Sequence, residues 1–472
     1  MKKTRPHHRL RKIAQALLLA LALPANALCA QPIDDGHVPT KAAVTTAVQR
    51  IADKTLTHIF IQGNKLSKDK DILAALPALR EGRTLDMKAL ANEILLANEN
   101  MSRQITVDLR LTWENTLDAY VTVQEDRAVK FALEFDNTGN DATGKWRTRL
   151  SYLNGNIGGT GQTGIFSYAT SPDNPSKISQ FGVYYNIPLP QAKDNLYLTA
   201  TYSDSNSGRI INAANYSVDS SGQGSSLGVH YVHNLRRSSN DKQSLDWGID
   251  ARQYKNDINF NVFNTSIPIG TDINSLPLSV FYQAQSLQNK TMTAYSLGYV
   301  YNVATGGKNS TDQYNLYRYG TSASYQIWRG SYTYQHLFPN NWLSNVAITG
   351  QYTGERLINP EQIGLGGARS LRGIDERELS GDRGVQGSFE LYTPEIAKGQ
   401  RLLFFIDVGY LNNVSPMDGE WNNVTAASCG IGWRGNLGSG YRAELDYGYV
   451  VSSTVDKYKN NNKVHVSLSK IF

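Results

Sequence analysis

From residue 129 to the C-terminus, the sequence consists of short segments in which apolar and polar residues alternate with a period of two. In the first of them, Val129, Phe131, Leu133 and Phe135 alternate with polar or small neighbours. The pattern returns at 181–187, 196–202, 295–301, 441–451 and 464–468. A two-residue period is the side-chain period of a β-strand, so each segment has one apolar and one polar face. This part of the chain is therefore predicted to be all β.

The lengths of the connections distinguish a membrane barrel from a soluble β-sandwich. We count about 16 candidate strands in residues 129–472. Long polar connections at 205–223, 255–277, 304–315, 354–384, 412–423 and 452–462 mostly alternate with short ones at 154–161, 190–194, 236–242, 285–289, 338–341 and 435–440. Long outside loops and short periplasmic turns are typical of outer-membrane barrels, and a wide lumen keeps the polar face in water. We predict an antiparallel transmembrane β-barrel of about 16 strands.

The formal net charge of +6 comes from the N-terminus. Six of the 47 basic residues precede the first acidic one, so without residues 1–30 the basic residues equal the 41 acidic ones in number. An apolar stretch at 13–23 and the sequence Ala25-Asn26-Ala27 follow the basic start, which predicts a secretory signal peptide over 1–30, cleaved after Ala27 or Ala30. The neutral mature chain gives no electrostatic footprint for nucleic acid.

Residues 55–125 differ from the rest and predict one small α/β domain. A short alternating segment at 56–61 ends in Gly63-Asn64, a turn signal. Two segments with helical spacing follow, the second after Asp86, and then two alternating segments at 105–111 and 119–123. The expected order is strand, helix, helix, strand, strand. Residues 31–54 are expected to form a linker or a short helix.

Two glycine motifs imitate nucleotide-binding loops but lack the required context. The segment 139–145 has phosphate-loop spacing, yet Trp146 stands where Ser or Thr should bind magnesium. The segment 430–435 matches a dinucleotide fingerprint but leads into a strand. The histidines are scattered, and Cys29 and Cys429 are the only cysteines. We therefore expect no metal site and no cofactor, and with no recognisable pair of nucleophile and base we expect no enzyme.

The connection at 354–384 is unusual for a solvated loop. It carries Glu361 to Ile374, rich in glycine and including Leu371-Arg372-Gly373-Ile374, and continues through Gly381-Asp382-Arg383-Gly384. One interpretation is a flexible exposed loop. The other is an ordered loop that folds back into the barrel, with Gly373 permitting a tight turn and Arg372 requiring a buried partner, because a buried unpaired cation is costly.

Strand parity offers partners for that arginine. If Phe404 and Ile406 face lipid, then Phe405 and Asp407 point into the lumen. The same argument turns Glu390 inward on the preceding strand. We predict a bidentate pair between Arg372 and Asp407, with Phe405 and Glu390 beside it.

These residues carry a resemblance. The chain resembles the outer-membrane transporters of two-partner secretion, the TpsB or haemolysin-activator family of the ShlB, FhaC and HecB type, which is related to barrel-assembly insertases. The resemblance rests on 135–145, 366–384, Glu390 to Pro394, Phe404 to Gly409 and the terminal Phe472, and the α/β unit resembles a POTRA domain. It implies that the loop arginine, here Arg372, pairs with the Phe-x-Asp carboxylate, here Asp407. The last strand, with Leu468 and Phe472, is expected to be the signal for barrel assembly.

The sequence departs from the family pattern in three places. Ile374 stands where the family usually has an aromatic residue, and one POTRA domain is expected where two are usual. Residues 41–54 have apolar residues at helical spacing, which fits either a remnant of the family's pore-plugging helix or a linker packed on the POTRA domain.

The resemblance implies export of a large TpsA-type exoprotein, an adhesin, haemolysin or toxin, from the periplasm to the cell surface. The barrel would lie in outer-membrane lipid, with the POTRA domain in the periplasm, where it would bind cargo at a sheet edge. Barrel-assembly machinery and periplasmic chaperones are expected partners during biogenesis. The alternative is a barrel-assembly insertase. A diffusion porin would need neither the POTRA domain nor an inserted loop.

Overall fold

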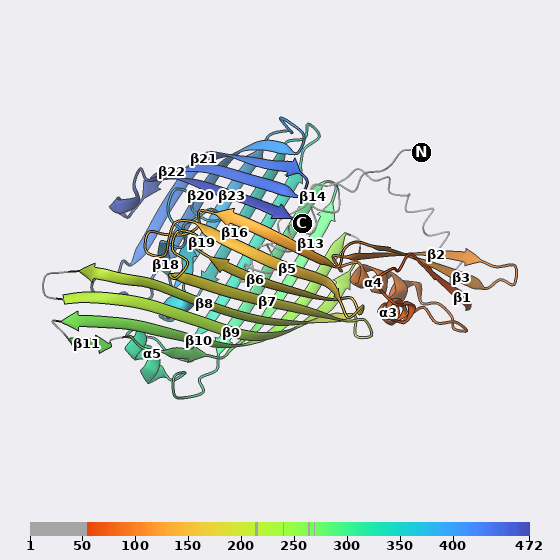
Figure 1. The fold of residues 1–472 in the computed structure, drawn as a ribbon, viewed down its shortest axis with the longest axis horizontal. Helices are drawn as coiled ribbons and strands as arrows, with labels where there is room; N and C mark the ends of the chain where they lie inside the picture. The colour runs from red at the N-terminus through yellow and green to blue at the C-terminus, as the bar shows by residue number, and fades with distance from the viewer. Residues whose placement is uncertain (1–53, 213–215, 239, 263–264, 269) are drawn as a thin grey trace.

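The structure is a computed structural model that describes residues 54–472 except 213–215, 239, 263–264 and 269 (Figure 1). The predicted signal peptide at 1–30 and all but the last residue of segment 31–54 lie outside the described residues. An α/β domain stands at one end of a β-barrel, and the chain ends in the last barrel strand.

The α/β domain has a three-stranded sheet covered by two helices. Its elements are β1 (Leu56–Gln62), α3 (Asp69–Ala75), α4 (Met87–Ala97), β2 (Arg103–Leu111) and β3 (Leu117–Glu125). The strand order is β1-β3-β2, with β1 parallel and β2 antiparallel to β3. The Asp86 side chain caps α4 by accepting a hydrogen bond from Ala89 N at 2.9 Å. Leu56, Ile72 and Val121 lie in the core between the helices and the sheet.

The sequence from Val129 onward forms a closed barrel of 16 strands. In chain order they are β4 (Val129–Asp136), β5 (Arg147–Ile157), β6 (Gln162–Thr170), β7 (Ile178–Leu189), β8 (Asp194–Asn212), β9 (Tyr216–Arg237), β10 (Asp241–Val262), β13 (Pro277–Gln288), β14 (Thr291–Asn302), β15 (Gln326–Leu337), β16 (Leu343–Tyr352), β19 (Arg383–Tyr392), β20 (Gln400–Asn412), β21 (Asn423–Gly438), β22 (Tyr441–Ser453) and β23 (Asn462–Ile471). The predicted antiparallel barrel is confirmed.

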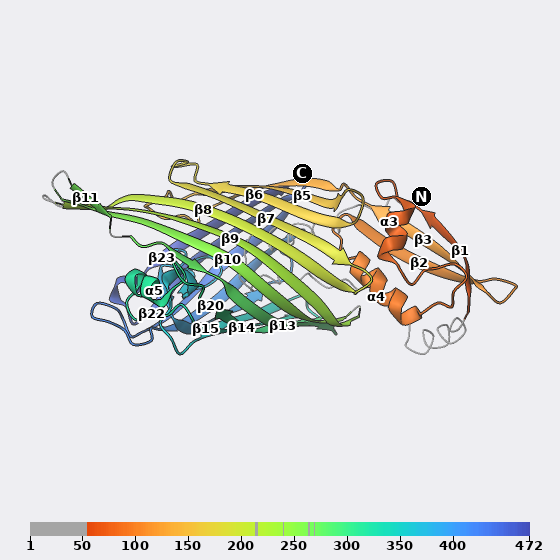
Figure 2. The same cartoon turned by 90° about the horizontal axis from the view of Figure 1, so that it is seen from below.

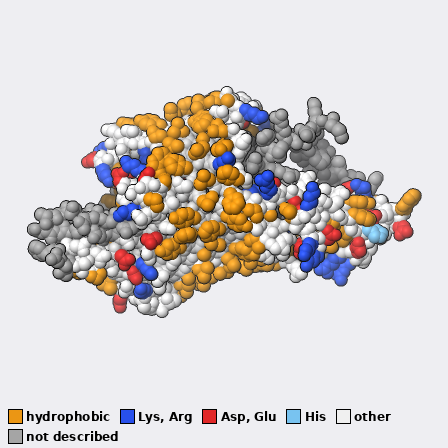
Figure 3. Space-filling model, in the orientation of Figure 1, with side chains coloured by type: hydrophobic (Ala, Val, Ile, Leu, Met, Phe, Trp, Pro, Cys, Tyr) orange, Lys and Arg blue, Asp and Glu red, His pale blue; other side chains and the backbone are white. Residues whose placement is uncertain are grey.

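Side-chain exposure along the barrel follows the two-residue period. On β20, Phe404 and Ile406 are 50% and 54% exposed, whereas Phe405 and Asp407 are 2% and 0% exposed. Figure 3 shows the outward apolar side chains as a broad band across the barrel wall. Such a band is what a barrel presents to the hydrocarbon core of a bilayer.

The prediction of long connections at 205–223 and 255–277 was wrong, because most of these residues lie in strands. Strand β8 continues to Asn212 and pairs with β9, while β10 runs on to Val262 and pairs with the short strands β11 (Thr265–Pro268) and β12 (Ile273–Ser275). Figure 2 shows these strands extending beyond the rest of the barrel, at the end opposite the α/β domain. Outside a bilayer neither face of a strand needs apolar residues, so the hydrophobic alternation disappears while the backbone pairing continues.

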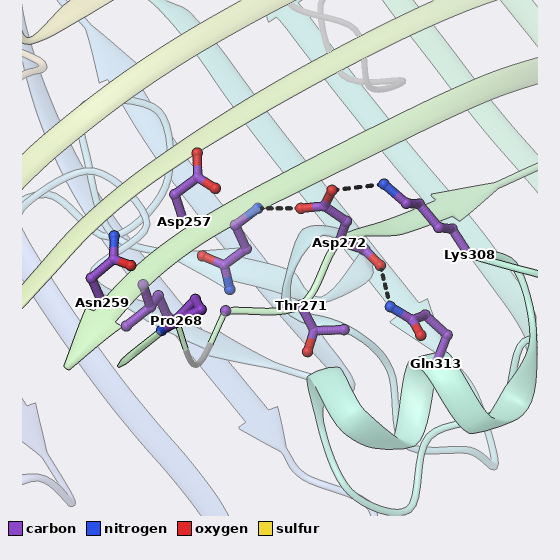
Figure 4. A pocket seen from close by; sticks show the side chains of 10 residues that line it. Asp257, Asn259, Pro268, Thr271, Asp272, Lys308 and Gln313 are labelled. Carbon is purple, nitrogen blue, oxygen red and sulfur yellow. Dashed lines mark hydrogen bonds and ion pairs between the residues drawn. The ribbon is translucent and has the colours of Figure 1, made fainter. Parts of the chain in front are cut away.

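A polar surface pocket of about 310 Å³ lies beside this extension (Figure 4). Its central carboxylate, Asp272, accepts hydrogen bonds from Lys308 Nζ at 2.8 Å and from Asn256 N at 3.2 Å. The Asp272 carbonyl accepts a bond from Gln313 Nε2 at 2.9 Å, on helix α5 (Thr311–Tyr317). The hydrogen bond from Lys308 to the Asp272 carboxylate lowers the pKa of Asp272 below its ordinary value. These bonds join the extension to α5.

The barrel closes where its last strand meets its first. The β23–β4 seam has five residue pairs, compared with eight between β4 and β5. The Asn137 carboxamide continues the seam beyond the end of β4, because its Nδ2 donates to Val464 O at 2.7 Å and its Oδ1 accepts from Val466 N at 2.9 Å. The side chain thereby takes the place of one further backbone residue.

Candidate functional site

The connection between β16 and β19, residues 353–382, folds back into the barrel lumen. It contains the short helix η2 (Asn359–Glu361) and a small hairpin of β17 (Ile363–Leu365) and β18 (Leu379–Gly381). Buried loop residues pack against the inner wall of β20, β21 and β22. This apolar cluster includes Leu365, Leu371, Ile374 and Leu379 from the loop and Leu411, Val424 and Val450 from the wall. The loop is therefore held by an apolar core that it shares with the barrel wall.

Arg372 lies in the turn between β17 and β18 and is 2% exposed. Its Nε and Nη2 donate to Asp407 Oδ2 and Oδ1 at 2.8 and 2.7 Å, and its backbone N donates to Asp407 Oδ2 at 3.1 Å. Its Nη1 donates to Glu390 Oε1 at 2.8 Å. The guanidinium carbon lies 3.4 Å from the centroid of the Phe405 ring, a cation–π contact. The structure thus brings Arg372, Phe405, Asp407 and Glu390 together.

The barrel wall adds residues that the sequence argument did not identify. Ser388 Oγ donates to Asp407 Oδ1 at 2.7 Å and accepts from Arg372 Nη2 at 3.0 Å. Asp446 on β22 lies 3.5 Å from Arg372 Nη1 and accepts two bonds from Arg434, at 2.5 and 2.8 Å. Parity could have identified Asp446, because its neighbours Leu445 and Tyr447 are exposed on the outer face.

Glycines allow the loop backbone to lie directly against the wall. Gly373 has φ +114°, a conformation that a residue with a side chain rarely adopts. A Cβ atom at Gly448 of β22 would lie 2.6 Å from the carbonyl carbon of Arg372. Only glycine at position 448 leaves room for the arginine turn.

The remaining predicted site residues lie in the apolar cluster or on the outer face of the last strand. Leu371 and Ile374 are 0% and 1% exposed, and Ile374 packs in the apolar cluster. Leu468 and Phe472 face outward, at 43% and 54% exposure. Phe472 N donates to Phe131 O at 2.9 Å, which places the terminal residue at the closing seam.

A second charged cluster also holds the loop, but here the loop supplies the carboxylate and the barrel wall supplies the arginines. Glu361, 1% exposed, accepts bonds from Arg252 Nη1 at 2.7 Å and from Arg329 Nη2 at 3.0 Å. Burial alone would raise the pKa of Glu361, but the charges of the two arginines outweigh that effect and lower it below the ordinary value. The loop therefore contributes a cation to wall carboxylates at Arg372 and an anion to wall arginines at Glu361.

At its C-terminal end the loop joins other surface loops. Asp382 is fully buried and accepts bonds from Arg318 Nη1 at 2.6 Å and from Val414 N at 2.9 Å. Arg318 follows α5, and Val414 follows β20, so this carboxylate ties three connections together. The sequence singled out Gly381 to Gly384 without predicting these contacts.

Within the residues that the structure describes, no three His, Cys, Asp or Glu side chains are grouped to hold a metal ion. No helix among them is long and apolar enough to cross a membrane.

Comparisons with known proteins agree with this architecture. Residues 117–435 match the family model described as haemolysin secretion/activation protein ShlB/FhaC/HecB. The chain is 22% identical to the heme/hemopexin transporter protein HuxB of Haemophilus influenzae (strain ATCC 51907 / DSM 11121 / KW20 / Rd) over 445 residues, covering 90% of this chain and 76% of that protein. It is 23% identical to the outer membrane transporter CdiB of Dickeya dadantii, covering 77% of this chain and 63% of that protein.

The fold is also similar to a solved structure. CdiB from Escherichia coli superposes with a TM-score of 0.74 at 16% identity, and the match covers 100% of both chains. The chain belongs to the ShlB/FhaC/HecB haemolysin secretion/activation family, the outer-membrane transporters of two-partner secretion.

Proposed function

We propose that this transporter carries an unfolded TpsA-type exoprotein through the barrel lumen, and that loop 353–382 is the element that cargo must displace. The observation that carries this proposal is the buried bidentate pair of Arg372 and Asp407 inside the lumen. Such a pair fixes the loop in one position, because a guanidinium and a carboxylate match in two parallel hydrogen bonds. Export breaks no covalent bond, and folding of the cargo outside the cell supplies the driving force.

The α/β domain is, in this proposal, a POTRA domain that receives the cargo by β-strand addition. The edge of β1 is largely covered. Leu56 N donates to Arg83 O at 2.9 Å, and Ile59 N donates to Glu81 Oε1 at 2.9 Å. A second strand could therefore not pair along β1 without displacing these contacts.

The outer edge of β2 is more open. At Ile105 the Asn98 carboxamide occupies it, with Nδ2 2.8 Å from Ile105 O and Oδ1 2.6 Å from Ile105 N. Since alternate residues of an edge strand point their N–H and C=O outward, Val107 and Leu109 present the next such groups. No strand in the described chain pairs with this edge. Residues 107–111 therefore offer an extended cargo segment main-chain hydrogen bonds.

The cargo is expected to be an adhesin, haemolysin or toxin of the TpsA type, encoded next to the transporter. HuxB, whose name describes a heme/hemopexin transporter, and the CdiB transporters are the relatives that support this class.

Reconstitution tests the proposal against the insertase alternative. The full transporter is placed in lipid vesicles, and a labelled, unfolded N-terminal part of the exoprotein encoded beside it is added on the α/β-domain side. Export predicts cargo that is protected from protease inside the vesicle and soluble there. In a parallel assay, a labelled, unfolded outer-membrane barrel replaces the exoprotein. Folding of that barrel in the bilayer, with no exoprotein crossing in the first assay, would favour an insertase instead.

A further inference from the structure

The connection between α4 and β2 meets the periplasmic rim of the barrel. We infer that Glu99 and Asn100 of this connection are positioning residues that seat the α/β domain on the rim and thereby aim the β2 edge at the lumen. We call residues 98–102, together with residues 155–161, Arg237 and Lys242 on the rim, the rim seat. The inference rests on the proposed export function.

Asn100 joins the domain to the first rim turn. Its Nδ2 donates to Gly155 O at 2.6 Å and to Gly161 O at 2.8 Å. Its Oδ1 accepts from Ser102 N and Ser102 Oγ, both at 2.9 Å. Both ends of the carboxamide are therefore engaged, which fixes its orientation toward the two carbonyl groups.

Glu99 joins the domain to a second rim turn. Its Oε1 lies 2.9 Å from Lys242 Nζ, and its Oε2 lies 3.1 Å from Arg237 Nη1. These cations stand on either side of the β9–β10 turn, whereas Asn100 binds the β5–β6 turn. Contacts to two separate hairpins restrain the rotation of the domain as well as its position.

The rim approaches the domain closely because it carries glycines. A Cβ atom at Gly155 would lie 2.7 Å from Ser102 Oγ, and one at Gly161 would lie 2.8 Å from Arg103 Nη2. Asn156 Nδ2 adds a bond to Ser67 Oγ at 3.1 Å. A side chain at Gly155 would collide with Ser102 and push the domain off the rim, whereas at Gly161 the end of the Arg103 side chain would have to move aside.

The geometry has a consequence for cargo. Strand β2 begins at Arg103, directly after the seat, and its open edge starts four residues later at Val107. A segment paired with this edge is therefore held in one direction relative to the barrel opening. Release of the seat would leave the edge intact but would no longer aim the cargo at the lumen.

The test weakens the seat and then restores it with a reversible tether. In a Cys429→Ser background, Asn100→Ala and Glu99→Lys are each expected to lower export about tenfold at normal barrel insertion, with Glu114→Gln, an exposed carboxylate in the β2–β3 hairpin, as the control. Lys242→Glu should partly restore export to Glu99→Lys. Ser67→Cys and Asn156→Cys, joined by a short bifunctional disulfide-forming reagent, should restore export to Asn100→Ala until a reductant is added.

Rescue that depends on the tether distinguishes positioning from a loss of folding, because a misfolded domain would not recover. Normal export by both seat variants would overturn the inference. So would a tether that stops the export shown by the untethered double-cysteine transporter in which Glu99 and Asn100 are unchanged. The efficiency of tether formation in membranes is measured separately. If tethering is efficient in the wild type and reduced in Asn100→Ala but no cargo is exported by either, the seat exists and the proposed function fails.

Discussion

Single residues set the position of the loop in the lumen. Arg372 meets Asp407 in two parallel hydrogen bonds, and Phe405 covers its guanidinium plane. A lysine would keep the charge but could neither form the fork nor stack in the same way. Arg372→Lys is therefore expected to retain only a small part of the export of the wild type, measured as cargo in the medium per inserted barrel. Export equal to that of the wild type would show that charge alone is sufficient.

Gly448 offers a second prediction at this scale. Gly448→Ala would place a Cβ atom 2.6 Å from the Arg372 backbone, so the arginine turn must leave the wall. We expect export to fall about tenfold, which corresponds to about 1.4 kcal/mol. The control is Gly350→Ala, where the new Cβ would make an ordinary contact at 3.5 Å. Equal export by the two variants would contradict this account of the wall.

At the scale of elements, one prediction concerns the open edge of β2 and another concerns the seam between β23 and β4. Val107→Pro removes an outward N–H without breaking the ladder to β3, and proline is tolerated on an edge. We expect cargo binding to the α/β domain to weaken severalfold in a pull-down with the full transporter. Val107→Ala keeps the N–H and serves as the control, so a similar loss in both variants would point to the side chain instead of the edge.

The seam depends on Asn137. Loss of its two hydrogen bonds in Asn137→Ala should cost about 1–2 kcal/mol, because each net bond contributes about 1 kcal/mol. The barrel is then expected to lose its folded gel mobility at a lower temperature than the wild type. Asn436→Ala is the matched control, because the Asn436 side chain accepts a bond from Gly438 N in its own hairpin, at 3.4 Å, and lies away from the seam. An unchanged transition in Asn137→Ala would show that the carboxamide does not stabilise the seam.

For the molecule as a whole, the two-residue period of the sequence predicted those features that the bilayer imposes on a barrel strand. Alternation along 402–410 placed Asp407 on the inner face, because lipid tolerates only apolar side chains on the other face. It could not find the ends of β8, β9 and β10, since outside the bilayer no such constraint acts on Ser205 to Gln223. The rim seat could not be predicted from the sequence either, because Asn100 bonds to residues 55 and 61 positions away. Pairing at that distance depends on how two domains dock, which no local pattern reports.

The central claim is that Arg372 and Asp407 act as one unit that holds the loop in the lumen. The most direct test is a double-mutant cycle of export with Arg372→Ala, Asp407→Ala and both together, at equal barrel insertion. Removing one member of a desolvated pair costs about 3 to 5 kcal/mol, less where water enters the lumen. We predict that each single change lowers export sharply, that the double change costs little more than either, and that Ile406→Ala on the lipid face leaves export intact. Losses that simply add would contradict the account.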